Sequence, residues 1–90
     1  MATAGLKHCP QSAPGLEINA VEDGYIVYQP ERDRVHYLNP TAALILELCN
    51  GRNAESELPE LLQSAFELSA PPAGEVQTCL QTLRAEGLIL

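Results

Sequence analysis

The sequence predicts an α+β domain in which a three-stranded antiparallel sheet is followed by three helices, in a winged helix-turn-helix-like arrangement. Up to about residue 38, apolar and polar residues alternate in short segments, as they do in strands. Beyond that point apolar residues recur every three or four positions, as they do in helices. The chain has 90 residues, so one small domain with one modest core is expected.

The first part of the chain predicts a meander of three strands. Residues 16–21 alternate, and Asp23-Gly24 is a typical hairpin turn signal. Residues 25–28 are β-branched and aromatic, and Pro30 ends that strand. Residues 34–38 form the third strand after a short polar turn, so all neighbouring strands should be antiparallel.

Asn39-Pro40 predicts the start of the first helix. Asn is a favoured N-cap because its side chain accepts a hydrogen bond from a free backbone N–H, and Pro suits the first helical position. Residues 41–50 are apolar on most sides, and Gly51 supplies a stop. This helix is therefore expected to be the central and most buried one.

Two further helices and a short apolar end complete the predicted domain. The second helix is expected to begin near Ser56, and the third follows Pro71-Pro72 and ends at Gly87. Residues 88–90 are expected to pack back on the core. Residues 1–15 show little periodicity and predict a flexible tail, which leaves residues 16–90 as the folded domain.

The composition is acidic, with 12 Asp and Glu against five Lys and Arg and a formal net charge of -7. Nucleic-acid binding needs several clustered basic groups, so no nucleic-acid partner is expected. An acidic surface suits a partner with basic segments. The chain has no apolar run of roughly 18 residues and no apolar stretch near its start, which argues against a membrane span and a secretory signal.

The three cysteines, Cys9, Cys49 and Cys79, lie far apart without CxxC spacing. An odd number of unpaired cysteines favours the reducing cytoplasm over a disulfide framework. Cys49 and Cys79 fall on apolar helical stripes, where Cys acts as a small hydrophobe, with a reactive thiol as the alternative. His8 and Cys9 lack further ligands for a metal, so no metal site is expected.

No catalytic constellation is evident, so the chain is expected not to be an enzyme. The carboxylates are spread over turns and helix faces, and nothing marks a pair for acid and base work. No Gly-rich elbow or phosphate-binding loop is present. His36 is expected on a strand surface; a Cys-His pair remains open, because such partners meet in space.

Several ordered features resemble the PqqD-like family, which includes the D protein of pyrroloquinoline quinone biosynthesis. They are the strand end at residues 28–31, the helix start at residues 37–42, and the apolar helix with a polar residue and Gly at residues 45–51. The pair Glu75-Val76 and the C-terminal segment 83–88 complete the pattern. The resemblance covers roughly residues 16–90.

Two departures from the family pattern favour a pathway other than that of the quinone. Asn50 stands where the family commonly has Asp, and the link over residues 30–34 is longer than in the quinone-pathway members. The chain looks more like a general PqqD-like protein from another peptide-modification cluster.

The resemblance implies a non-catalytic recognition element that holds the leader segment of a ribosomally made precursor peptide and presents it to a modifying enzyme. That enzyme is often a radical S-adenosylmethionine enzyme with its own cofactors, and the resemblance implies that the domain itself holds no cofactor. The leader would add as a strand to an exposed sheet edge and lie against the third helix. The implied peptide-binding residues are Arg34, Val35, His36 and Tyr37 on the edge, with Val76, Cys79, Leu80 and Leu83 as the wall.

Other interpretations stay open beside this one. The four helix positions also fit an ordinary core stripe, and an uncovered edge permits homodimerisation. A winged-helix regulator that binds DNA would need a basic recognition helix, whereas the third helix carries only Arg84, with Glu75 and Glu86 beside it. A small metal or thiol protein that uses the cysteines is the remaining alternative.

Overall fold

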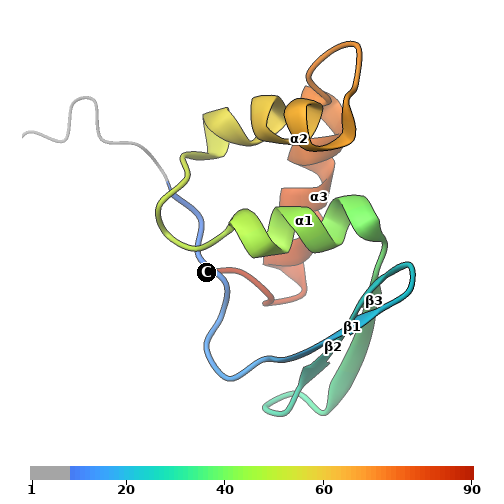
Figure 1. Cartoon of the computed structure of the whole chain (residues 1–90). Helices are drawn as coiled ribbons and strands as arrows, with labels where there is room; N and C mark the ends of the chain where they lie inside the picture. Colours follow the sequence, from blue (N-terminus) through green and yellow to red (C-terminus); the bar gives the residue numbers. More distant parts are fainter. Residues whose placement is uncertain (1–8) are drawn as a thin grey trace, which may run out of the picture.

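A computed structural model describes residues 9–90 and confirms the α+β arrangement, with the sheet preceding the helices (Figure 1). The strands are β1 (Glu17–Val21), β2 (Gly24–Gln29) and β3 (Arg34–Leu38). Their order is β1-β2-β3, and both pairings are antiparallel. The predicted meander is therefore present with nearly the expected bounds, while likeness to a winged helix-turn-helix stays a prediction.

Three helices follow the sheet, as predicted. They are α1 (Pro40–Leu48), α2 (Leu58–Phe66) and α3 (Ala73–Ala85), with a short 3-10 turn η1 (Glu55–Glu57) before α2. The side chain of Asn39 accepts a 2.8 Å hydrogen bond from the Ala42 N–H, so the expected N-cap forms. α1 contacts the sheet and both other helices, which confirms its central place.

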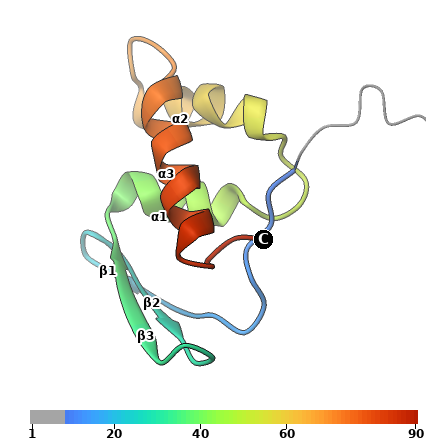
Figure 2. The same cartoon turned by 180° about the vertical axis from the view of Figure 1, so that it is seen from behind.

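The helices cover one face of the sheet and leave the other face open (Figures 1 and 2). On the covered face Val27 of β2 is completely buried, and it lies opposite His36 of β3. On the open face Val35 and Tyr37 of β3 keep 65% and 56% of their surface exposed. Alternate side chains of β3 therefore meet two different environments, whereas β1 is exposed along its whole length.

The β1–β2 turn depends on a glycine. Gly24 has φ +142°, and a Cβ atom there would lie 1.9 Å from the backbone oxygen of Leu38. Because a side chain at this position would collide with β3, only glycine lets the start of β2 lie so close to the end of β3.

One hydrophobic core joins the helices to the covered face of the sheet. It is mainly aliphatic, as the low aromatic content of 4% requires. Its larger members are Val27, Leu38, Ile45, Leu46, Leu58, Leu62, Val76, Leu80, Leu83, Leu88 and Ile89. The last two confirm that the C-terminal segment packs back on the core.

The structure differs from the expected tail over residues 10–13. Pro10 is buried, and the N–H of Ser12 donates to the Cys49 oxygen at 2.7 Å. The N–H of Leu90 donates to the Gln11 oxygen at 2.8 Å, so this segment bridges α1 and the C-terminus. Backbone pairing of this kind has no side-chain pattern, which is why the sequence did not indicate it. Residues 1–8, including His8, lie outside the described residues.

The substitution Leu80→Ala tests whether α3 is fixed by its core face. Leu80 is 0% exposed, so its truncation should lower the free energy of unfolding by about 2–5 kcal/mol. Thr82→Ala on the exposed face of the same helix should change it by about 0.5 kcal/mol or less. Urea denaturation measures both, and equal midpoints for the two variants would contradict the assignment of Leu80 to the core.

Candidate functional site

The strand β3 forms a border of the sheet. It pairs with β2 along its whole length and, within residues 9–90, with no strand on its other side. The unpaired backbone N–H and C=O groups of such a border can accept an added strand. The predicted edge residues Arg34, Val35, His36 and Tyr37 therefore all lie on a free edge.

The side chains of β3 divide between two faces, and the pairing register assigns each of them. Val35 and Tyr37 point to the open face, opposite Tyr28 and Ile26 of β2. Arg34 and His36 share the covered face with Leu38 and point toward the helices. An added strand would place alternate side chains on the same two faces.

Three of the four positions of the predicted wall on α3 are buried, so their contact with a peptide stays a prediction. Val76, Leu80 and Leu83 are 1%, 0% and 2% exposed and belong to the core. A domain of this size has few apolar residues to spare, so the main stripe of α3 is used to bury α1 and α2. Cys79 is half-buried at the border of the core and remains open to a ligand.

A different stripe of α3 ends at a residue that contacts β3. Glu75, Cys79, Thr82 and Glu86 follow one another at spacings of four, three and four, which places them on one side of a helix. Glu86, still right-handed helical in its backbone, reaches the side chain of Arg34 on β3. The sequence analysis did not include Glu75, Thr82 and Glu86 among the peptide-binding residues, although their position beside the apolar stripe was an available signal.

A pocket of about 490 Å³ opens at the far end of this stripe. It lies between the start of α1 and the first half of α3, directly after the end of β3. Its lining consists of Asn39, Thr41, Ala42, Gly74, Glu75, Thr78 and Cys79. Small and polar side chains dominate this lining, so an extended chain can lie close to both helices.

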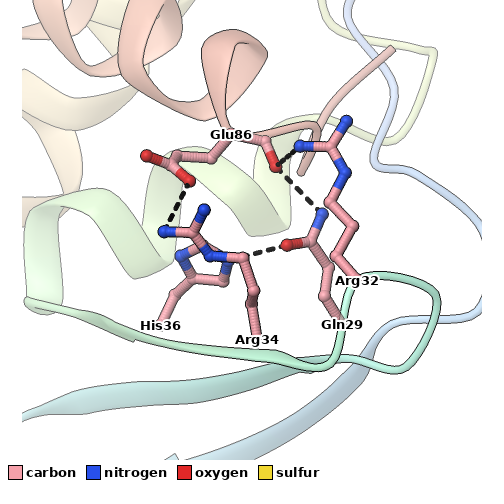
Figure 3. A network of polar contacts seen from close by, with 5 residues as sticks. All are labelled: Gln29, Arg32, Arg34, His36 and Glu86. Carbon is pink, nitrogen blue, oxygen red and sulfur yellow. Dashed lines mark hydrogen bonds and ion pairs between the residues drawn. The ribbon is translucent and has the colours of Figure 1, made fainter.

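The other end is closed by a polar network around Gln29 (Figure 3). Gln29 is only 5% exposed, and its Nε2 donates to the backbone oxygen of Glu86 at 2.9 Å. A carbonyl oxygen only accepts, so the Oε1 of Gln29 must face His36, whose Nε2 lies 2.7 Å away. His36 therefore carries its proton on Nε2 and is a half-buried partner rather than the expected surface residue.

Two arginines complete this network. Arg32 donates from its NH1 to the same Glu86 oxygen at 3.1 Å, and Arg34 pairs with the Glu86 carboxylate at 3.5 Å (Figure 3). Gly87 has φ +76°, and a Cβ atom there would lie 2.8 Å from the guanidinium of Arg32. The predicted helix stop at Gly87 thus also leaves room for Arg32.

Neither Cys49 nor Cys79 has the lowered pKa of an activated thiol. Burial raises the pKa of Cys79, and burial together with the nearby Cys79 raises the pKa of Cys49 to about 11. All three cysteines are free. Among residues 9–90 no three His, Cys, Asp or Glu side chains gather as metal ligands. A nucleophilic cysteine would need the opposite shift, toward a lower pKa.

Three further features bear on the remaining alternatives. Arg84 pairs with Glu55 at 3.6 Å, so the basic residue of α3 is directed toward η1. No helix within residues 9–90 is long and apolar enough to cross a membrane. Tyr25 donates a hydrogen bond to Glu47, and this bond together with burial raises the pKa of Tyr25.

Comparison with known protein families gave a match. The family described as coenzyme PQQ synthesis protein D (PqqD) matches residues 24–89, which spans β2 to the C-terminal segment and includes both β3 and α3. This confirms the resemblance inferred from the sequence. Neither the curated proteins nor the solved structures gave a match.

The substitution Gln29→Leu tests the polar network. It leaves the Glu86 oxygen without its buried donor and His36 without an acceptor, so the free energy of unfolding should fall by about 1–3 kcal/mol. Gln81→Leu, on an exposed position of α3, is the matched control and should cost less than about 0.5 kcal/mol. Equal urea midpoints for the two variants would show that the network does not hold α3 to the sheet.

The raised pKa values predict how the thiols react. In the folded protein the rate of Cys79 alkylation by iodoacetamide should reach half its maximum at a higher pH than in denaturant, because the thiolate is the reacting form. Cys49 is buried and should react only as fast as the protein opens. Mass spectrometry of each cysteine peptide over a pH series measures this, and a lower midpoint for folded Cys79 would indicate an activated thiol.

Proposed function

The chain belongs to the PqqD family, and we propose that it binds the leader segment of a ribosomally made precursor peptide by strand addition to β3. Proteins of this family are non-catalytic accessory proteins that bind a precursor peptide and work with a modifying enzyme. In this proposal the leader, called the guest strand below, lies between β3 and α3. It is presented there to a radical S-adenosylmethionine enzyme in the reducing cytoplasm.

The observation that carries the proposal is the free border of β3 beside the polar stripe of α3. An added strand gains main-chain hydrogen bonds from the border, while alternate side chains enter the space next to the helix. Cys79 lines the pocket at one end of that space. At the other end the Arg34–Glu86 ion pair connects β3 to the end of α3. The guest would therefore contact Glu75, Cys79 and Thr82 rather than the buried core stripe.

Titration calorimetry with the leader of a precursor encoded beside this gene tests the proposal. We expect a Kd of about 10 µM or tighter. Thr82→Trp fills the space facing β3 and should weaken binding at least about tenfold, a loss that roughly 1.4 kcal/mol would produce. Gln81→Trp, on another face of α3, is the matched control and should bind as the unchanged protein does. Absence of binding to the unchanged protein would refute the proposed function.

Backbone N-methylation of the leader separates strand addition from other modes of binding. In an added strand every second N–H points to the sheet, so methyl groups in one register should abolish binding and those in the other should be tolerated. Bound leader should also slow alkylation of Cys79 and leave Cys9 unaffected. If the leader binds equally well with methyl groups in either register, strand addition at any edge of the sheet is excluded.

A further inference from the structure

The space between β3 and α3 carries opposite charges at its two ends. At one end Arg34 and Arg32 both lie beside Glu86, so two positive charges face one carboxylate and the end is net positive. At the other end Glu75 of α3 lines the pocket. The remaining stripe positions between them, Cys79 and Thr82, are uncharged. A chain that lies along the space therefore meets a cation at one end and an anion at the other.

The Arg34 end is occupied by an exchangeable partner. The Arg34–Glu86 ion pair is 3.5 Å long, and its two side chains keep 58% and 36% of their surface exposed. An ion pair this exposed contributes little to stability. A guest carboxylate can replace that of Glu86, while the Glu86 backbone oxygen keeps its bonds to Gln29 and Arg32.

The other end offers the carboxylate of Glu75, which is exposed. Glu75 forms no ion pair with any residue of the described chain, and the pocket beside it has the apolar surfaces of Ala42, Gly74 and Cys79. The N-terminal end of α3 offsets only about half a charge, so the site stays negative. A long basic side chain could lay its stem on these surfaces and its charged end on Glu75.

The length of the space fixes how far apart the two charges of the guest must be. From residue 75 to residue 86 a helix rises roughly 16 Å, and an extended strand covers that length in about five residues. Side chains on one face of a strand are separated by an even number of residues. The matching charges in the guest therefore lie about four or six residues apart.

We propose that Arg34 and Glu75 form a two-ended charge reader, which selects a guest strand with an acidic and a basic residue on one face and sets its direction. This inference rests on the proposed binding of a leader segment by strand addition. The leader places its carboxylate on Arg34 and its basic side chain on Glu75. Because the two ends have opposite signs, a guest of the reversed direction brings like charges together and is rejected.

Charge exchange between protein and peptide tests the proposal. The probes are the leader of the precursor encoded beside this gene and a synthetic copy in which the acidic and basic residues are exchanged. The double variant Arg34→Glu/Glu75→Arg should bind the original leader at least about tenfold more weakly and prefer the exchanged copy. Arg52→Glu/Glu60→Arg makes the same charge changes at exposed positions away from the space and should leave the preference unchanged.

A second variant examines the role of Glu86. Glu86→Gln removes the internal competitor for Arg34 but keeps the backbone oxygen that Gln29 and Arg32 bind. Binding of the original leader should become at least about twofold tighter. A purely structural ion pair would instead give unchanged or weaker binding. The single changes Arg34→Gln and Glu75→Gln, both at exposed positions, should each weaken binding several-fold.

The outcomes separate this proposal from the function on which it rests. If the unchanged protein binds the leader and the double variant binds it equally well, the charge reader is refuted and leader binding stands. A leader that binds but lacks opposite charges at the stated spacing would also refute the charge reader and leave leader binding intact. If no leader binds the unchanged protein, both proposals fail together.

Discussion

The arrangement of the site depends on one buried amide. Gln29 lies in a strand otherwise made of apolar and aromatic residues, and its side chain bonds to both the Glu86 oxygen and His36. A buried polar group that loses a partner costs stability, so only arrangements that keep both bonds are favourable. The end of α3 is thereby held at a fixed place beside the β2–β3 hairpin, and the free border of β3 runs along the helix.

This constraint explains how a helix of thirteen residues can serve the core and still leave a face for a guest. Val76 and Leu80 point into the core, whereas Glu75 and Thr82 lie on neighbouring sides of the same turns. Cys79 stands at the boundary and belongs to both. In a domain this small the wall of a binding groove must be built from what the core does not use.

The sequence predicted the strands and helices, but it did not predict which side of α3 lies beside the edge of the sheet. Period-two and helical spacing predicted the strands and helices, and Asn39-Pro40 predicted the start of α1, because those signals are local. Residues 10–13 pair through backbone groups, which no side-chain pattern reveals. The sequence left open which face of α3 lines a groove, since an apolar stripe does not tell which of its sides meets a sheet edge. Only the contact of Glu86 with Arg34 supplies that direction.

The net charge of -7 is a weaker guide to the guest than the placement of two side chains. Mobile ions screen exposed charges beyond about 8 Å at physiological ionic strength, and Arg34 and Glu75 stand farther apart than that. In the proposed complex each end of the groove would therefore interact with its own charge on the guest almost independently of the other end and of the distant carboxylates. The acidic surface as a whole acts on the rate at which a partner approaches, whereas discrimination between bound segments depends on contacts at each end. An acidic protein can for this reason hold a segment that itself carries a carboxylate, provided that the carboxylate arrives at Arg34.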